Sequence, residues 1–427
     1  MHPLLAWPYR MGMHAASWLA YAPLPGDSKF LRSLRARRDA TAPFLAWAAK
    51  HRDPARPLLW MHAPSVGEGL QAKPVLQLLR ERHPQLQVVY THFSPSAERF
   101  AAGVGADLTA YLPFDTPGNA AALCEALRPT ALVYAKLDLW PVLTAGARAL
   151  GIRLGMISAT LAERSGRRGP MARALLRDAY AALDAVGAID DEDATRLTQL
   201  GVPASRIVVT GDTRYDQVAA RAAARAQDSG SLGQLRSTRP TLVAGSTWPA
   251  DERVLLAAWR ALRVAVPEAR VIIAPHEPTA AHCAPIEQWA AASGLRLARV
   301  DAATGDDDVV LVDRVGILGD LYALADAAFV GGGFHAAGLH SVLEPAAFGC
   351  PVVFGPRYHG SRDARLLYES RGGEPARGVP ELLRALRILL TEEDTRARAG
   401  DAALSVVRQG LGAAERSVAL VERLLGV

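Results

Sequence analysis

The sequence predicts an α/β protein with two doubly wound domains, each built on a parallel sheet that helices cover on both faces. Short, almost wholly apolar segments alternate along the chain with helices rich in Ala, Leu and Arg, a pattern typical of parallel strands buried on both sides. The alternation restarts after residues 221–240, which read as an Ala/Arg helix followed by a Gly/Ser-rich loop. The chain of 427 residues is long enough for two domains of roughly 200 residues each.

The expected strands of the first half all precede that loop. They are LLWMHA (58–63), QVVYTH (87–92), ALVYA (131–135), IRLGMIS (152–158), AVGAI (185–189) and RIVVTG (206–211). The second half restarts with TLVAGS (241–246), VIIAP (271–275), VVLVD (309–313), AAFVGG (327–332) and PVVFGP (351–356). We therefore expect an N-terminal segment 1–30, a first domain 31–215 and a second domain 216–427. Ligands of such sheets bind beyond the carboxyl ends of the strands, so two facing domains would enclose one central cleft.

Composition excludes several classes of protein. The formal charge is +5 and arginine carries most of the excess, but no long basic run or aromatic-interleaved patch indicates a nucleic-acid partner. The three cysteines, Cys124, Cys283 and Cys350, are far apart and form no CxxC pair. We therefore expect reduced thiols, without a disulfide framework or a zinc site.

The N-terminal segment has a composition of its own. Residues 3–24 are rich in Trp, Tyr, Leu and Met but are interrupted by polar residues and proline, and the basic stretch KFLRSLRARR (29–38) follows. No uninterrupted apolar run is long enough to span a bilayer. An interfacial anchor fits the pattern, with aromatic rings at headgroup depth and arginines near anionic lipid. The alternative is an amphipathic helix packed on the protein body.

Four turns that directly follow expected strands are candidates for the site. Glu68 lies between two glycines in SVGEG (65–69), and GSTW (245–248) offers main-chain N–H and hydroxyl donors suited to an anion. The triple glycine 331–333 leaves room for a ligand near the backbone, and HSVLEP (340–345) places Glu344 at a helix start. The alternative for both glutamates is a helix-start carboxylate that the helix dipole favours.

Other known signatures are absent from the sequence. The segment GGGFHAAG (331–338) lacks GxGxxG spacing, and neither GxxxxGK[ST] nor HExxH occurs. Of the two acidic clusters, residues 190–193 fit a helix cap, and residues 306–308 fit a solvated loop. We therefore expect neither a metal nor a cofactor.

An ordered series of motifs resembles a known family. The series is SVGE, YLPFDTPG, KLDLWP, GDTRYD, AGSTWPADE, APHEP, LGDLYALADAAFVGGG and HSVLEPAAFGCPVVFGP. It resembles the Kdo transferases, which move 3-deoxy-D-manno-octulosonic acid (Kdo) from CMP-Kdo to the lipid A precursor in lipopolysaccharide biosynthesis. The match runs from about residue 58 to 360. It implies the GT-B fold: two Rossmann-like domains, with the acceptor mainly on the first and the nucleotide mainly on the second.

The resemblance also implies roles for individual residues. The family's catalytic base falls on Glu68, with Asp138 as the second catalytic candidate, and the glutamate that holds the ribose falls on Glu344. Expected donor contacts are completed by Ser341, Gly331, Gly332, Gly333, His276, Ser246, Thr247 and Arg214. Expected acceptor contacts are Ser65, Gly67 and Lys136.

Three motifs depart from those of many members. This chain has KLDLWP (136–141) for ETELWP, HSVLEP for HNxLEP, and PHEP (275–278) for RHPER. The first departure replaces an acid by Lys136 and shortens another to Asp138. The second replaces asparagine by Ser341, and the third removes an arginine near the donor phosphate.

The resemblance also implies a location at the cytoplasmic face of the bacterial inner membrane, peripheral or monotopic. The chemistry agrees with an inverting, metal-independent transferase. CMP leaves as a stable phosphate monoester, so one carboxylate that deprotonates the acceptor suffices, and Arg214 or Lys136 would balance charge. The alternatives are another GT-B enzyme, such as a nucleotide-sugar epimerase or a different lipid glycosyltransferase, and a non-catalytic GT-B scaffold.

Overall fold

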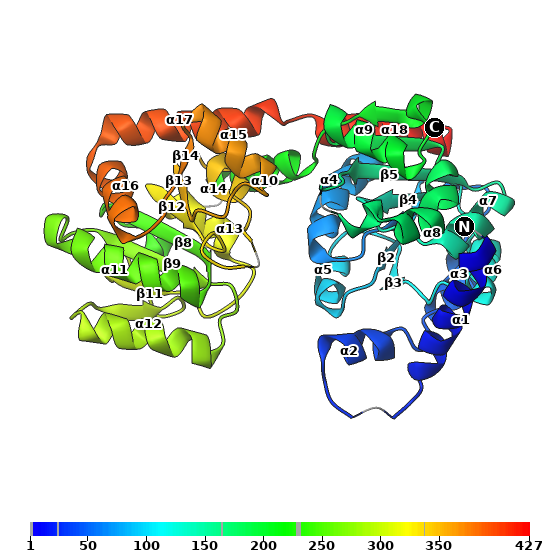
Figure 1. The fold of residues 1–427 in the computed structure, drawn as a ribbon, viewed down its shortest axis with the longest axis horizontal. Coiled ribbons are helices and arrows are strands. Elements are labelled where there is room, and N and C mark those ends of the chain that lie inside the picture. Colours follow the sequence, from blue (N-terminus) through cyan, green and yellow to red (C-terminus); the bar gives the residue numbers. More distant parts are fainter. Residues whose placement is uncertain (1–2, 24, 164, 228–231, 337) are drawn as a thin grey trace. The chain divides into compact units, whose positions relative to one another are not determined.

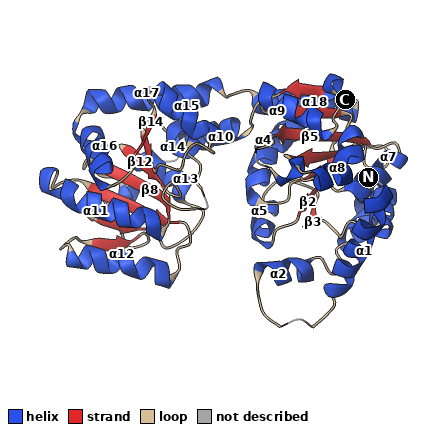
Figure 2. Ribbon diagram, in the orientation of Figure 1, coloured by secondary structure: helices blue, strands red, loops and turns tan. Residues whose placement is uncertain are grey.

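The computed structural model of the chain describes residues 3–23, 25–163, 165–227, 232–336 and 338–427. It divides into two compact units: residues up to 217 together with 411–427, and residues 218–410. Each unit contains one seven-stranded sheet, and every described strand pair is parallel. The predicted fold class is confirmed (Figures 1 and 2).

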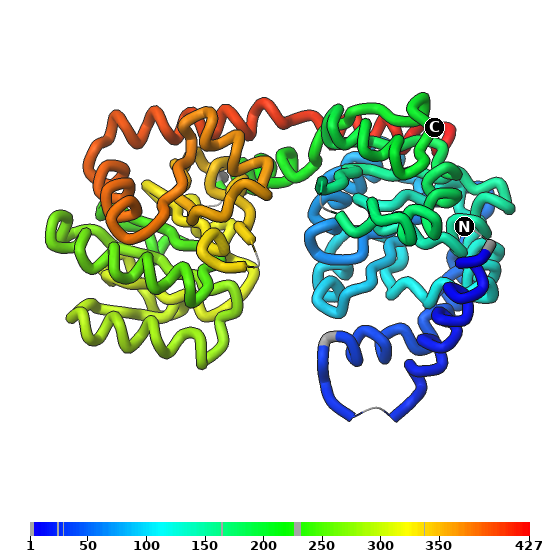
Figure 3. Tube along the Cα trace, viewed as in Figure 1, coloured from blue at the N-terminus to red at the C-terminus, as the bar shows by residue number. Residues whose placement is uncertain are grey.

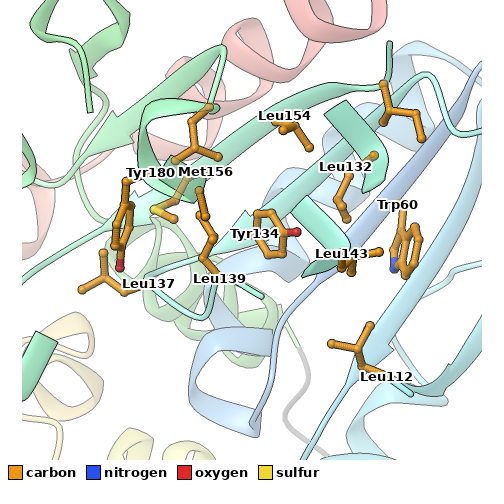
Figure 4. Packing of buried hydrophobic residues seen from close by; sticks show 14 of the residues in the cluster. Trp60, Leu112, Leu132, Tyr134, Leu137, Leu139, Leu143, Leu154, Met156 and Tyr180 are labelled. Carbon is orange, nitrogen blue, oxygen red and sulfur yellow. The ribbon is translucent and has the colours of Figure 1, made fainter. Parts of the chain in front are cut away.

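The first sheet has the strand order β3-β2-β1-β4-β5-β6-β7. Its strands are β1 (Leu58–His62), β2 (Gln87–His92), β3 (Leu108–Tyr111), β4 (Ala131–Ala135), β5 (Arg153–Ala159), β6 (Ala185–Ala188) and β7 (Ile207–Val209). Side chains alternate between two cores: Trp60 packs with one cluster and Met61 with the other. Figure 4 shows the first cluster, in which Trp60, Tyr134 and Tyr180 are among the largest side chains.

Helices cover both faces of this sheet. Helices on the face that buries Trp60 are α3 (Ala42–His51), α6 (Pro117–Leu127), α7 (Pro141–Ala149), α8 (Pro170–Ala181) and α9 (Asp191–Leu200). Helices on the face that buries Met61 are α4 (Val66–Arg82), α5 (Glu98–Ala101) and α18 (Ala413–Leu425).

The second sheet has the strand order β10-β11-β9-β8-β12-β13-β14. Its strands are β8 (Thr241–Thr247), β9 (Arg270–Pro275), β10 (Leu297–Arg299), β11 (Val309–Leu311), β12 (Ala327–Val330), β13 (Val352–Phe354) and β14 (Gly373–Pro375). Its helices are α10 (Arg214–Gln227, which begins in the first unit), α11 (Pro249–Ala265), α12 (Ala280–Ala292), α13 (Leu318–Leu321), α14 (Leu343–Ala347), α15 (Arg362–Ser370), α16 (Val379–Thr391) and α17 (Glu393–Gln409).

Each strand expected from the sequence is present, and the three that the prediction lacked are edge strands. β3 closes one edge of the first sheet, and β10 and β14 close the two edges of the second. β3 is half-buried throughout, and β10 is half-buried to exposed. An edge strand is not enclosed on all sides, so its sequence need not be a continuous apolar run, and the prediction depended on such runs.

The C-terminal helix corrects the expected domain boundary. Residues 411–427 belong to the first unit and not to the second, as the red C-terminal segment shows in Figure 3. Apolar residues of α18, including Val418 and Val421, are buried in the same cluster as Met61. The Asp216 carboxylate also accepts the N–H groups of Gly412 and Ala414 at 2.8 and 2.9 Å, which fixes the start of α18 beside α10.

The N-terminal segment forms α1 (Pro3–Leu19) and α2 (Lys29–Ala36). One side of α1 packs on the first unit, because the Tyr9 hydroxyl donates to Asp115 Oδ2 at 2.8 Å. Other positions carry exposed aromatic rings, with Trp7 69% and Trp18 80% exposed. The segment therefore combines features of both expected alternatives. Among the described residues, no helix combines the length and apolar character needed to cross a membrane.

Candidate active site

In each sheet, predicted site residues collect where the strand order changes direction. β1 lies between β2 and β4, and β8 lies between β9 and β12, so successive connections leave these points on opposite faces. Glu68 follows β1 and Asp138 follows β4. The turn at Ser246 ends β8, and the triple glycine follows β12. Strand topology thus brings together residues far apart in sequence.

The Glu68 carboxylate is held by two other predicted site residues. The Ser65 hydroxyl donates to Glu68 Oε2, and Lys136 Nζ lies 3.3 Å from Glu68 Oε1. A Ser-x-x-Glu start commonly makes a reciprocal helix cap, but Ser65 makes no side-chain cap here. Its hydroxyl is instead directed at the carboxylate, whose side chain is 17% exposed. Ser65, Glu68 and Lys136 therefore form one polar group at the strand ends.

The two glycines beside Glu68 have different surroundings. A Cβ on Gly69 would lie 2.4 Å from Phe100 Cε1 and 2.8 Å from the Tyr90 hydroxyl, so packing requires glycine there. A Cβ on Gly67 would meet only Ser65 Oγ, at 3.8 Å. Gly67 thus leaves open space next to the carboxylate.

Three non-glycine residues with left-handed backbone lie at the carboxyl ends of strands: Lys136, Ser158 and Ser246, with φ values of 65°, 50° and 52°. Such backbone costs about 1–3 kcal/mol per residue and concentrates at functional sites. At Lys136 the conformation is restrained by the main-chain hydrogen bond from its N–H to Ile157 O at 2.8 Å. This backbone places the Lys136 side chain beside Glu68.

Asp138 has a different environment, which the sequence did not reveal. Its Oδ2 accepts from His62 Nε2 at 3.1 Å and from Trp140 Nε1 at 3.2 Å, and Arg167 lies 3.6 Å from Oδ1. Burial raises the pKa of Asp138, but the hydrogen bond from His62 and the neighbouring charges outweigh it and hold the pKa below its usual value. Asp138 is therefore a carboxylate that its neighbours already satisfy.

The orientation of His62 follows from its second nitrogen. Thr91 Oγ1 accepts from Trp60 Nε1 at 3.0 Å and lies 3.0 Å from His62 Nδ1. If the Thr91 hydroxyl donates to Nδ1, the His62 proton is on Nε2 and is donated to Asp138. His62 is inside a buried strand, where the sequence pattern gives no sign of a polar role.

In the second unit, the triple glycine is required by close backbone approach. A Cβ on Gly331 would lie 2.2 Å from Ser246 O, and one on Gly333 would lie 2.4 Å from Gly355 N. Asp251 ties this turn to α11, because Oδ2 accepts from Gly332 N at 2.7 Å and Oδ1 from Phe334 N at 2.9 Å. Main-chain packing thus explains these glycines, and their contact with a donor stays a prediction.

Four aromatic rings stack at the same strand ends. Trp248 lies between His335 and His276, with ring centroids 4.3 and 4.6 Å apart, and His276 lies 4.5 Å from His340. Trp248 Nε1 donates to His340 Nε2 at 3.0 Å, so the proton of the neutral His340 ring is on Nδ1. Burial and the neighbouring His276 lower the pKa of His340 to about 4. The sequence prediction included only His276 among these rings.

Glu344 is the second residue of α14, which has only five residues. Burial raises its pKa, and Arg221 opposes that shift. Arg221 is itself paired with Asp320 at 2.8 Å. Among the described residues no hydrogen bond to the Glu344 carboxylate is recorded, and Val342 occupies the N-cap position. Glu344 is thus a half-buried carboxylate whose oxygens are not used to cap the helix.

The remaining predicted donor residues are more dispersed. Ser341 is exposed. Thr247 is buried, and its hydroxyl donates to Glu252 Oε1 at 2.7 Å. Arg214 lies in the first unit, where its guanidinium binds the Asp212 carboxylate at 2.6 Å. The assignment of these residues to the donor stays a prediction.

The acidic clusters have structural partners. Asp190 caps α9 by accepting Asp193 N, as expected. Asp308 was expected in a solvated loop, but it pairs with Arg239 at 2.6 Å and Arg263 at 3.3 Å. Within the described ranges, no group of three His, Cys, Asp or Glu side chains is arranged to hold a metal. The three cysteines are free and buried.

Comparisons with known proteins agree with one another. The model of the family described as 3-deoxy-D-manno-octulosonic-acid transferase (kdotransferase) matches residues 35–217. A 3-deoxy-D-manno-octulosonic acid transferase of Bordetella pertussis is 32% identical over 404 residues, which cover 91% of this chain and 92% of that protein. One from Haemophilus influenzae is 28% identical over 373 residues, covering 86% and 87%.

Among solved structures, the chain is similar to UDP-GlcNAc 2-epimerase from Neisseria meningitidis bound to UDP-GlcNAc. The TM-score is 0.63 at 14% identity, and the match covers 87% of this chain and 100% of that chain. At this identity the likeness shows the fold alone. It confirms the expected GT-B arrangement of two Rossmann-like domains.

The depressed pKa of His340 predicts a dependence of stability on pH. The unfolded chain takes up this proton near its ordinary pKa of 6.5, whereas the folded protein resists it down to about 4. Stability conferred by the neutral ring is therefore present above 6.5 and is lost as pH falls through this window. We expect His340→Asn to show a smaller fall in the Tm of the second unit between pH 6.5 and pH 4 than the wild type. His14→Asn, which removes an exposed histidine, serves as the control, and equal slopes for all three proteins would contradict the prediction.

Proposed function

The chain belongs to the 3-deoxy-D-manno-octulosonic acid (Kdo) transferase family, and we propose that it is an inverting glycosyltransferase that moves Kdo from CMP-Kdo to the lipid A precursor. Membership of the family supports Kdo transfer in lipopolysaccharide biosynthesis. We propose in addition that the donor is CMP-Kdo, that the acceptor is the lipid A precursor, that the anomeric configuration is inverted and that no metal is required.

The Glu68 carboxylate is the observation that carries the proposal. It lies at the strand ends, is not used as a cap, and has open space beside it at Gly67. In the proposed reaction, Glu68 accepts the proton of an acceptor hydroxyl while the oxygen of that hydroxyl bonds to the anomeric carbon of Kdo. The bond from that carbon to the phosphate oxygen breaks on the opposite face, and CMP leaves with the bonding electrons.

Lys136 and Ser65 position the base in this proposal. The ion pair with Lys136 and the hydrogen bond from Ser65 engage different oxygens of Glu68, so the carboxylate has a fixed orientation. Positioned groups of this kind contribute to rate because the proton acceptor does not have to be brought into line during the reaction. Asp138 is the less suitable proton acceptor, because it already accepts hydrogen bonds from His62 and Trp140. It remains the second candidate for the catalytic base.

The donor is assigned to the second unit. Glu344 is half-buried and is proposed to accept hydrogen bonds from the ribose hydroxyls of CMP, which are strengthened by the negative charge of the carboxylate. His340 adds an Nδ1–H donor that the sequence prediction did not include. Ser246, Thr247, Ser341, His276, Arg214 and the glycine turn remain proposed donor contacts. CMP departs as a stable monoester, so the proposal requires neither a general acid nor a metal.

The acceptor is a lipid in this proposal, and α1 and α2 supply the surface that would meet a membrane. Trp7 and Trp18 on α1 and Phe30 on α2 are exposed, and α2 carries arginines between its apolar positions. Exposed aromatics beside arginines are typical of interfacial segments. We therefore propose peripheral or monotopic binding at the cytoplasmic face of the inner membrane.

The direct test is to incubate the full chain with CMP-Kdo and a lipid A precursor in detergent micelles, in a buffer with EDTA, and to determine the mass of the lipid product. We expect a lipid heavier by one or more Kdo residues, together with released CMP. UDP-GlcNAc in place of CMP-Kdo is expected to give no product. Consumption of UDP-GlcNAc without lipid product would favour an epimerase, and failure with both donors would favour the non-catalytic scaffold.

Replacing the proposed base tests the mechanism. Glu68→Gln keeps the shape and removes the proton acceptor, so transfer is expected to fall by about 10²–10⁴-fold while CMP affinity and Tm change little. A purely structural helix-start carboxylate would instead cost about 0.3–1 kcal/mol of stability with near-normal turnover. Asp190→Asn, at a true helix cap, is the matched control and is expected to keep full turnover. Near-wild-type transfer by the Gln variant would place the base elsewhere, with Asp138→Asn tested next.

Replacing the proposed ribose ligand tests the donor site. Glu344→Ala removes charge-assisted hydrogen bonds and is expected to weaken CMP binding by about 1.5–3 kcal/mol in calorimetry. Glu374→Ala is the matched control, because this carboxylate is also partly buried in the second unit but lies on β14 at the sheet edge. An unchanged CMP affinity in the Glu344 variant would remove it from the site.

A further inference from the structure

The first unit contains an apolar cavity that none of the assigned roles uses. It has a volume of about 490 Å³ and lies among α1, α2 and the loops that follow β2, β3 and β4. Its walls include Met13, Ala16 and Leu19 of α1, Phe30 of α2, and the rings of Phe93 and Trp140.

Polar side chains in the wall are engaged within the protein. Arg37 donates from Nε to Leu112 O at 2.8 Å and from a terminal nitrogen to Pro113 O at 2.7 Å. Its guanidinium lies over the ring of Phe93, 4.5 Å from the centroid. The Ser33 hydroxyl donates to Phe93 O at 3.4 Å. A sugar or nucleotide in this cavity would lose hydrogen bonds to water without replacing them, which is costly, so the occupant must be apolar.

The inner wall adjoins the candidate active site. The Trp140 ring stacks on Phe93 at 5.6 Å, and its Nε1 donates to Asp138 Oδ2 at 3.2 Å. Asp138 in turn follows β4 at the same strand ends as Lys136 and Glu68. A molecule in the cavity would therefore lie next to the residues assigned to the acceptor.

The outer wall is continuous with an exposed apolar surface. Leu19 and Phe30, which line the cavity, are themselves 41% and 66% exposed, and Trp18 is 80% exposed. The same helix as Phe30 carries Arg32, which is half exposed and lies 4.0 Å from Asp27. Exposed apolar surface that leads into an apolar cavity, on a helix that also carries arginine, suits an amphiphile with an anionic head and a hydrocarbon tail.

We propose that this cavity binds one fatty acyl chain of the lipid acceptor. The identity of that lipid rests on the proposed function, but the binding of a hydrocarbon chain rests on the cavity alone. Each methylene group that enters the cavity is removed from water, so binding is expected to strengthen with the length of the acyl chain. Trp140 then separates the chain from the polar group around Glu68 and places the head of the lipid at the strand ends.

Binding is tested directly with cis-parinaric acid, a fatty acid whose fluorescence rises in a dry site, using the full chain without detergent. We expect saturable binding of one molecule per chain. Ala16→Phe fills the cavity and is expected to weaken binding at least tenfold. Ala15→Phe adds the same ring one residue away, at an exposed position outside the wall, and is expected to bind as the wild type does. Met13→Glu places in the wall a charge of the same sign as the carboxylate of the probe, without adding bulk, and is expected to weaken binding even if Ala16→Phe fails to fold.

Turnover then separates this proposal from the proposed function. In Ala16→Phe, the KM for the acylated acceptor is expected to rise tenfold or more, with kcat and CMP affinity unchanged. A chemically deacylated acceptor is expected to give equal KM values in Ala16→Phe, Ala15→Phe and the wild type. Saturable parinaric acid binding without any Kdo transfer would overturn the proposed function and leave the cavity's role standing. Non-saturable binding, or equal binding by Ala15→Phe, Ala16→Phe and Met13→Glu, would overturn the acyl-chain proposal.

Discussion

Parallel pairing of every described strand is the constraint on which both candidate sites depend. Because all strands of a sheet point the same way, each connection must return over a face, and the carboxyl ends collect at one edge. At β1 and β8 the strand order changes direction, and the connections on either side separate to opposite faces. Residues 68 positions apart, Glu68 and Lys136, thereby come within 3.3 Å. The same rule brings the turns that follow β8 and β12 together in the second unit.

In the second unit, the turns that meet at the strand ends pack closely against one another. The glycine turn approaches the main chain at Ser246 and Gly355 so closely that no Cβ fits, and the main-chain N–H groups of a buried turn need acceptors. Asp251 supplies them, and it also accepts Trp248 N at 2.9 Å, which starts α11. One carboxylate thus fixes a helix start, a glycine turn and the main chain at Trp248. The Trp248 ring in turn sets the tautomer of neutral His340, because Trp248 Nε1 donates to its Nε2.

The sequence predicted the parts of this structure that repeat and missed those that depend on single contacts. Buried strands are recognisable because they are apolar on both faces, whereas the edge strands β3, β10 and β14 are not. The turn at residues 65–69 was singled out because it directly follows an expected strand, and the roles of Ser65, Glu68 and Lys136 came from the family resemblance. His62 was not predicted, since it is the last residue of an apolar strand, and Arg167, which pairs with Asp138, comes from a distant part of the chain. The position of α18 in the first unit was not predicted, because the hydrogen bonds from Gly412 and Ala414 to Asp216 produce no periodic pattern in the sequence.

The two carboxylates of the first unit show how environment can assign different roles to similar groups. Asp138 accepts from His62 and Trp140 and lies near Arg167, so its charged form is already stabilised and a proton is held weakly there. Glu68 has one hydroxyl and one ammonium as partners and faces open space at Gly67. Lys136 stands where many members of the family have a glutamate, and its charge offsets that of Glu68. With Lys136 at this position Glu68 has a cationic partner, while Asp138 has partners of its own in His62, Trp140 and Arg167, so each carboxylate of the strand ends is paired separately.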